Sequence, residues 1–287
     1  MNTPHERVAR YQDPSGRPRL ARVHGQGTSL QPLEGVRLEP VAGDLFGERS
    51  PTGEPWVEAR AVRLLAPVLP SKIIGIGSNY RDHAAELGRP LPTVPKVFLK
   101  PPSAVIGPGD PIPLPPGSER VDHEAELAVV LGRTLSRARP DEAMAAIAGY
   151  TCLNDVTARD LQKIDGVFAR AKGFDGFCPI GPWLSVGLDP SRLGLRCRLL
   201  HPDGRVVLAQ DGNTDQLAFG VAELLAFVSN IMTLWPGDLI ATGTPAGVGP
   251  LVAGVRVQVE IDGIGILENP VIDRADRADQ RRAAQGG

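Results

Sequence analysis

The stretch S-E-R-V-D-H-E-A-E-L-A-V-V-L-G, residues 118–132, decides how we interpret this chain. Its second half is apolar and β-branched and lies between P-P-G and a glycine, which predicts a β-strand. Because strand side chains alternate, we expect Asp122, Glu124 and Glu126 on one face, with the two glutamates about 7 Å apart. Such acids repel each other when buried unless a divalent cation lies between them, and oxygen ligands favour Mg²⁺, Mn²⁺ or Ca²⁺ over zinc. The alternative is an edge strand with a solvated acidic face.

The bulk properties are those of an ordinary globular protein. The chain has 287 residues, of which 42% are hydrophobic and 22% charged, with a net charge of −2. This balance predicts no binding to nucleic acid or to an anionic membrane. Three cysteines without metal-ligand spacing predict reduced thiols and a cytoplasmic location, and we find no signal peptide or membrane-spanning run.

A short helix after the strand at 72–77 carries a candidate catalytic pair. Asn79 or Ser78 can cap this helix, which should end at Gly88. His83 and Glu86 lie three residues apart and so face the same way. A carboxylate on one imidazole nitrogen fixes the tautomer and raises the basicity of the other nitrogen, as in a general base. The alternative is a surface helical pair with no catalytic role.

Two further residues are candidates whose ordinary roles are structural. Asp155 ends a predicted strand at 149–155, where site residues often project, although aspartate is also a common helix cap. Lys172 lies in a Gly/Pro-rich loop at 169–183, where a lysine is usually solvated. The loop at 243–249 has free N–H groups that can bind a carboxylate or phosphate.

The remaining pattern is rich in predicted strands. Residues 1–70 predict a small β-rich N-terminal subdomain, residues 71–272 the main domain, and residues 273–287 a frayed tail. We expect helices at 140–147 and 221–231, and a helical turn at 156–162. Hairpins are predicted at 195–209 and 256–271, each around an Asp-Gly turn.

Taken together, these motifs closely resemble the fumarylacetoacetate hydrolase family. The matching stretches, which cover residues 71–271 in the right order, are G-I-G-S-N-Y-R-D-H-A-A-E at 75–86, F-L-K-P at 98–101, D-H-E-A-E-L-A-V-V-L-G at 122–132, N-D-V-T-A-R-D-L-Q at 154–162, K-G-F-D at 172–175, C-P-I-G-P-W at 178–183 and P-G-D-L-I-A-T-G-T-P-A-G-V-G at 236–249. The first 70 residues resemble the variable N-terminal part of the shorter, prokaryotic-type members.

The resemblance implies an α+β, β-rich fold with a rolled mixed β-sheet catalytic domain, usually as a homodimer. It implies that Glu124, Glu126 and Asp155 bind Mg²⁺ or Mn²⁺, with Ca²⁺ as a further candidate. It also implies roles for the other positions that match the family's motifs: His83 and Glu86 as a catalytic dyad on a lid-like segment, Lys172 as a catalytic residue, and Arg159, Gln162 and Thr244 as substrate contacts.

The chain departs from the family pattern at three places. Asn79 stands where the larger fumarylacetoacetase has a further metal-binding aspartate, which places this chain with the branch that has three acids. Residues 164–168 and Gly176 also differ from the expected pattern, which leaves the substrate open.

Three functions remain under consideration. The first is a metal-dependent hydrolase that cleaves a C–C bond of a 2,4-dioxo acid (an acylpyruvate such as fumarylpyruvate) and releases pyruvate. The second is an oxaloacetate decarboxylase or a 2-hydroxy-dienoate isomerase on the same metal site, because fold does not fix the reaction. The third is a non-catalytic relative that binds a keto acid. The absence of G-x-S-x-G and H-E-x-x-H excludes serine hydrolase and zincin chemistry.

Overall fold

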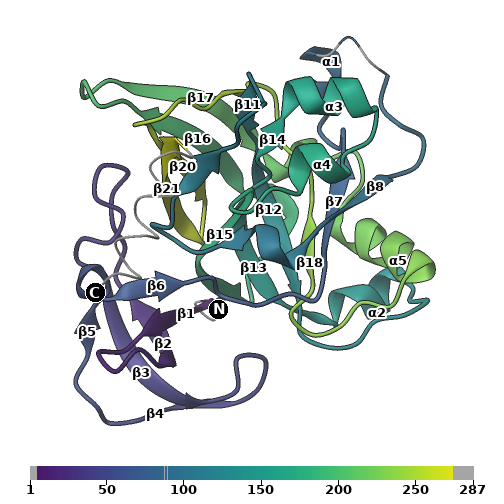
Figure 1. Cartoon of the computed structure of the whole chain (residues 1–287). Helices are drawn as coiled ribbons and strands as arrows, with labels where there is room; N and C mark the ends of the chain where they lie inside the picture. Colours follow the sequence, from purple (N-terminus) through teal and green to yellow (C-terminus); the bar gives the residue numbers. More distant parts are fainter. Residues whose placement is uncertain (1–4, 87, 89, 274–287) are drawn as a thin grey trace.

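The fold is built on one large curved sheet, to which two smaller sheets and a few short helices are added (Figure 1). The computed structural model describes residues 5–86, 88 and 90–273. The predicted tail at 273–287 lies outside the described residues except for Asp273.

The large sheet runs from the N-terminal strands into the middle of the chain. Its strands follow the order β4 (Arg49–Pro51), β3 (Arg37–Gly43), β2 (Pro18–His24), β1 (Glu6–Gln12), β15 (Cys178–Val186), β13 (Ile147–Asn154), β12 (Ala125–Leu131), β18 (Leu239–Ala241), β7 (Ile73–Gly77) and β8 (Lys96–Lys100). Three short strands pair at its side: β5 (Val57–Glu58), β6 (Arg63–Leu65) and β9 (Val105–Ile106). The sheet is mixed, because β18 runs parallel to β7 whereas β12 is antiparallel to both of its neighbours.

The two smaller sheets complete the β-structure of the described residues. One has the order β10 (Ile112–Leu114), β21 (Gly265–Asp273), β20 (Arg256–Ile261), β16 (Gly194–Leu200) and β17 (Val206–Asn213). The other has the order β14 (Thr157–Ala158), β11 (Val121–His123) and β19 (Gly249–Pro250). The α-helices are α1 (Arg81–Glu86), α2 (Pro140–Met144), α3 (Arg159–Asp165), α4 (Ala169–Lys172) and α5 (Val221–Ile231). In Figure 1, α2 and α5 lie together on one side, and α3 and α4 lie beside β14.

Strand β12 explains why the acidic stretch is buried. All seven of its residues are buried, because it lies between β13 and β18 at the centre of the large sheet. A strand covered on both faces needs a continuous apolar run, and A-L-A-V-V-L provides one with a single exception, Glu126. A carboxylate in that position needs a specific partner, because burying an unpaired charge is costly.

The stretch at 118–132 does not form the single strand that alternation predicted. Its second half is β12, but β11 belongs to a different sheet, and Glu124 lies at the break between them. The break is stabilised locally, because the Glu124 N–H donates to the side chain of Asn154 (2.9 Å). Glu124 therefore lies where the chain passes from the three-stranded sheet into the large sheet.

The other predicted elements are confirmed with some shifts of their ends. Helix α5 has the predicted bounds, and both predicted hairpins form, as β16–β17 and β20–β21. The helix predicted at 140–147 ends at Met144, because Ile147 already pairs with Leu131 in the sheet. The segment at 169–183 is more regular than the predicted loop, since it contains α4 and most of β15.

Candidate metal centre and active site

Three buried carboxylates converge at the ends of β12 and β13. Glu124, Glu126 and Asp155 each offer one oxygen, and these oxygens lie within 4.8 Å of one another. The pairing of β12 with β13 sets Ala125 opposite Asn154, and the Asp155 N–H donates to the Glu124 carbonyl (2.8 Å). The exposed fraction of each acid is 6% or less. The predicted acids therefore meet in space although Asp155 is far from the others in sequence.

Asp122 does not join this cluster. Its carboxylate accepts from Arg120 (3.0 and 3.2 Å) and from Nε of Arg159 (2.9 Å). Asp122 nevertheless lines the same cavity as Glu124 and Glu126, as the predicted alternation places it, although the strand is interrupted at Glu124. Asp122 also orients Arg159, whose Nη2 donates to Glu124 (2.5 Å).

Two buried lysines surround the acids. The Lys172 ammonium donates to Glu124 (2.8 Å), to Asp155 and to Thr157 (2.8 Å). Lys100, which the sequence interpretation did not assign to the site, donates to Asp155 (2.6 Å). In the sequence, Lys100 belongs to the F-L-K-P stretch that matches the family, but no role was assigned to it. Lys172 is not a solvated loop residue, because it ends α4 and is 3% exposed.

These contacts shift the pKa values of Glu124 and Glu126 in opposite directions. Burial alone would raise the pKa of Glu124, but ion pairs with Lys172 and Arg159 hold that pKa below its usual value. For Glu126, burial raises the pKa well above its usual value, and the nearby charges of Asp155 and Glu124 raise it further. The charge of Lys172 lowers the pKa of Glu126 only in part, so it does not offset the burial of this carboxylate.

The donor set fits a hard divalent cation. All three candidate ligands are carboxylate oxygens, which Mg²⁺ and Mn²⁺ prefer, and the set contains no thiol or imidazole. The Gly243 N–H donates to Glu126 (2.8 Å), which fixes the direction of that carboxylate. A cation at this place would supply the positive charge that Glu126 lacks.

The predicted dyad is formed and lies at the same cavity. The Glu86 carboxylate contacts Nδ1 of His83 at 3.0 Å. Because a carboxylate can only accept, Nδ1 carries the proton and Nε2 remains free to act as a base. His83 is 7% exposed, whereas the side chain of Glu86 is 41% exposed, so the imidazole is buried and its carboxylate partner lies at the surface.

The glycine loop at 243–249 connects the dyad to the acid cluster. Its Gly247 N–H donates to Glu86 (3.1 and 3.3 Å), and its Ala246 N–H donates to Asp82 at the start of α1 (3.3 Å). Gly247 has φ +93°, and a Cβ there would lie 2.1 Å from the Ala209 carbonyl oxygen, so only glycine fits. The loop N–H groups thus bind the protein's own carboxylates at three positions.

The three acids and His83 line one cavity of about 710 Å³, which we call the acid cavity. The lining residues also include Ile76, Gly77, Ser78, Phe98, Arg120, Asp122, Arg159, Gln162, Lys163, Gly166, Phe168, Lys172, Thr244 and Val248. All predicted substrate contacts, Arg159, Gln162 and Thr244, are among them. The sequence interpretation did not assign Arg120, Lys163, Phe98 or Phe168, whose positions depend on how β8, β11 and α3 pack together.

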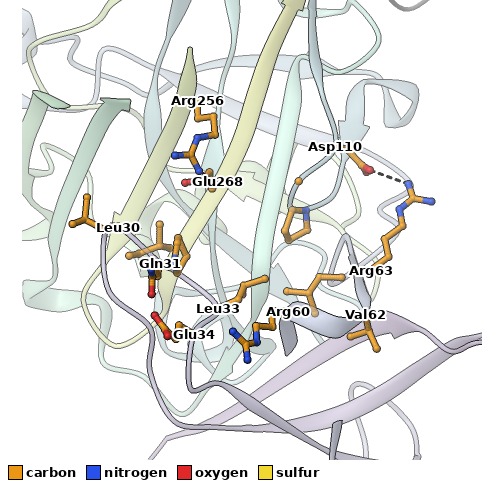
Figure 2. A pocket seen from close by; sticks show the side chains of 15 residues that line it. Leu30, Gln31, Leu33, Glu34, Arg60, Val62, Arg63, Asp110, Arg256 and Glu268 are labelled. Atoms are coloured by element: carbon orange, nitrogen blue, oxygen red, sulfur yellow. Dashed lines mark hydrogen bonds and ion pairs between the residues drawn. The ribbon is translucent and has the colours of Figure 1, made fainter. Parts of the chain in front are cut away.

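A second cavity, of about 660 Å³, lies between N-terminal segments and the five-stranded sheet that contains β20 and β21 (Figure 2). Its charged side chains are mostly paired with each other: Arg63 with Asp110 (2.8 Å) and Arg256 with Glu268 (2.8 Å). Within the described residues, it contains no cluster of metal-ligating side chains. We therefore place the candidate active site in the first cavity, and we call this second one the junction cavity.

Comparison with known proteins identifies the family of this chain. The model of the family described as "Fumarylacetoacetate (FAA) hydrolase C-terminal" matches residues 72–272, and a model described as "Rv2993c-like, N-terminal" matches residues 6–67. The chain therefore belongs to the fumarylacetoacetate hydrolase family, and the predicted family and rolled β-rich fold are confirmed. Members of this family are enzymes, including hydrolases, isomerases and tautomerases.

Individual relatives agree over most of the chain. Protein Rv2993c of Mycobacterium tuberculosis is 44% identical over 93% of this chain and 98% of its own length. The crystal structure of 2-hydroxyhepta-2,4-diene-1,7-dioate isomerase from Mycobacterium marinum has a TM-score of 0.83, with 40% identity over 94% of this chain and 99% of that one. The human mitochondrial oxaloacetate tautomerase FAHD2A is 42% identical over 76% of this chain and 72% of its own length.

One further finding concerns membranes. Within the described residues, no helix has the length and apolar character needed to cross a bilayer.

Proposed function

We propose that this protein is a divalent-metal-dependent hydrolase that cleaves an acylpyruvate into pyruvate and a carboxylate. The observation that carries the proposal is the presence of the His83–Glu86 pair at the same cavity as the three acids. Hydrolysis needs an activated water beside a group that stabilises an enolate, and this arrangement offers a base for the first task and a cation site for the second.

Glu124, Glu126 and Asp155 would hold Mg²⁺ or Mn²⁺. When bound, such a cation supplies Lewis-acid polarisation of a 2-oxo carbonyl group and stabilises negative charge that develops on its oxygen. The remaining steps are assigned to the side chains of this chain.

His83 begins the reaction as the general base. Its Nε2 takes a proton from water, whose oxygen attacks the C4 carbonyl carbon of the substrate, while Glu86 stabilises the imidazolium through Nδ1–H. The C3–C4 bond then breaks, its electron pair passes to the 2-oxo end as an enolate, and the proton on His83 returns to C3. The products are a carboxylic acid and pyruvate, so that one water is consumed.

Lys172 and Gln162 are the proposed donors to the oxyanion at C4. The side-chain oxygen of Gln162 already accepts from Arg159 (3.2 Å), which directs its NH₂ group elsewhere. Lys172 is charged at neutral pH, because its ion pairs with Asp155 and Glu124 outweigh burial and raise its pKa. A preorganised donor of this kind is worth about 3 kcal/mol in the transition state.

Arg159 and Thr244 are the proposed contacts to the substrate carboxylate. Arg159 already donates to Asp122, Glu124 and Gln162, so only part of its guanidinium remains for a ligand. We therefore propose that Arg159 acts as much by fixing Glu124 and Gln162 as by touching substrate.

The second candidate function is proton transfer without C–C cleavage, as in a keto–enol tautomerase or dienoate isomerase. It is favoured by two relatives, an oxaloacetate tautomerase and a dioate isomerase. Both enzymes are named for dicarboxylic substrates, and the cationic side chains of Arg120 and Lys163 line the cavity of this chain. Oxaloacetate decarboxylation is retained as a third reaction of the same enolate chemistry.

One assay separates these reactions. The purified protein is incubated with Mg²⁺ or Mn²⁺ and with fumarylpyruvate, oxaloacetate or a 2-hydroxy-dienoate. Pyruvate release from fumarylpyruvate supports hydrolysis, whereas loss of enol absorbance from oxaloacetate without pyruvate supports tautomerisation. Pyruvate and CO₂ from oxaloacetate indicate decarboxylation, and binding without turnover indicates a non-catalytic relative.

We also propose that the protein is a homodimer and that residues 1–70 and 71–272 are its two structural units. Light scattering coupled to size-exclusion chromatography tests the first statement, and limited proteolysis near 67–70 tests the second.

A further inference from the structure

Gln210 is a buried polar side chain to which the proposed mechanism gives no role. It lies on β17, is 1% exposed, and does not line the acid cavity. Its amide nevertheless reaches both the strand that carries the metal-binding acids and the glycine loop. The side-chain oxygen accepts from the Ala125 N–H (3.0 Å), and the NH₂ group donates to the Pro245 carbonyl and to the Thr244 hydroxyl (both 2.8 Å).

These partners fix the orientation of the amide. A main-chain N–H can only donate and a carbonyl can only accept, so the oxygen of Gln210 must face Ala125 and its nitrogen must face Pro245. His123, whose Nδ1 lies 3.1 Å from the same oxygen, must therefore carry its proton on Nδ1. Burial lowers the pKa of His123, which agrees with this neutral form.

The same reasoning fixes the Thr244 hydroxyl. Because it accepts from Gln210, its own proton is directed to the Ala125 carbonyl, to which it donates at 2.8 Å. Its only proton is therefore used inside the protein. The hydroxyl of Thr244 is not available as a donor to a substrate carboxylate.

The main-chain N–H of Thr244, unlike the hydroxyl, is not used in a hydrogen bond among the described residues. Thr244 is nevertheless only 5% exposed and lines the acid cavity. The neighbouring Gly243 N–H is already bound to Glu126. A buried main-chain donor without a partner is uncommon, and at a cavity it marks a place for a ligand acceptor.

We propose that Gln210 is a positioning residue that locks the Thr244 hydroxyl and so presents the Thr244 main-chain N–H to the carboxylate of the 2-oxo acid. This inference rests on the proposed function for the identity of the ligand. It assigns the carboxylate contact to the backbone of the loop, and it explains why a glutamine is buried between β12 and the loop.

The test is a double-mutant cycle between Gln210→Met and Thr244→Val, with Thr244→Ser as the matched control. Each of the first two variants removes the same hydroxyl–amide contact, so each should raise KM roughly 5- to 10-fold and leave kcat within about twofold. The double variant should lose less than the sum of the two single variants, because the two residues share this contact. Thr244→Ser keeps the hydroxyl and should raise KM less than Thr244→Val does.

A binding readout keeps the inference separate from the proposed reaction. Oxalate, a small planar carboxylate, is titrated calorimetrically into each variant with Mn²⁺ present, and Mn²⁺ affinity alone is measured by electron paramagnetic resonance. Weaker oxalate binding with unchanged Mn²⁺ affinity supports the inference even if no substrate in the panel is turned over, which would overturn the proposed function alone.

Three results would overturn the inference instead. These are additive losses in the double variant, a strong effect of Thr244→Val with none from Gln210→Met, or unchanged oxalate affinity in both single variants. Circular dichroism shows whether Gln210→Met folds. If it does not, the oxalate affinities of Thr244→Val and Thr244→Ser are compared, and equal affinities contradict a locked hydroxyl.

Discussion

The acid cavity and the junction cavity are similar in size but differ in how their charges are paired. In the junction cavity, the arginines pair with acids at the surface, as Arg63 does with Asp110 and Arg256 with Glu268. In the acid cavity, three carboxylates are buried together, and Glu126 has no cation of its own. The volume of a cavity therefore does not distinguish the candidate site from other cavities. An unbalanced buried charge does distinguish it.

The largest expected effect comes from Glu126→Gln. This change keeps the size of the side chain and the contact with Gly243 but removes one anionic ligand. We expect loss of metal-dependent turnover and at least a tenfold weaker affinity for Mn²⁺, measured by electron paramagnetic resonance. Full turnover after exhaustive chelation of the parent protein would contradict the assignment of the acid cavity as a metal centre.

The next effect is expected for His83→Ala. Loss of a general base should lower kcat about 10²- to 10⁴-fold, with metal affinity unchanged because His83 is not among the ligands. Steady-state kinetics and the Mn²⁺ titration measure the two quantities. Glu86→Gln is the matched variant, and it should lower kcat less, because the imidazole remains in place. A hydrolytic kcat that survives His83→Ala would favour the tautomerase alternative.

A smaller effect is expected for Lys163→Ala. Lys163 lines the acid cavity, lies four residues after Arg159 on α3, and is exposed, so its contribution to binding a second carboxylate should be modest. We expect KM to rise up to about fivefold for a dicarboxylic substrate and to stay constant for acetylpyruvate, which has one carboxylate. Equal changes for both substrates would exclude Lys163 as a determinant of specificity.

The smallest effect is expected in the junction cavity. Arg256→Ala removes one partner of a surface ion pair, which should cost about 0–1 kcal/mol of unfolding free energy. We expect kcat and KM to stay at the parent values, and urea unfolding monitored by fluorescence gives the stability. A large change in kcat or KM would contradict this distinction between the two cavities, because it would mean that the junction cavity takes part in the reaction.

Much of the candidate site could be predicted because its residues follow local rules. The spacing of His83 and Glu86 on a helix and of Glu124 and Glu126 depends only on nearby sequence, and these pairs do meet in the structure. The metal-binding role of Asp155 followed only from the resemblance to the family. Alternation also placed Asp122 beside the glutamates, and all three acids line the acid cavity. Nearby sequence did not reveal that Asp122 pairs with Arg120 and Arg159 and stays outside the metal cluster.

The contacts that escaped prediction are those between distant segments. Lys100 reaches Asp155 across 55 residues, and Gln210 reaches His123 across 87. Such pairs depend on how whole strands pack, which single-sequence patterns do not encode. Helix α5, in contrast, has the predicted bounds, because its apolar stripe is a local signal.

The distribution of the acids over two neighbouring strands has a consequence for the life of the protein in the cell. Because Glu126 belongs to β12 and Asp155 follows β13, an ion held by both would act as a cross-link between segments that meet only after the sheet has assembled. Ions that bind only the assembled form stabilise it by mass action. Metal supply would thereby set how much of this enzyme persists against proteolysis, as well as how fast it works.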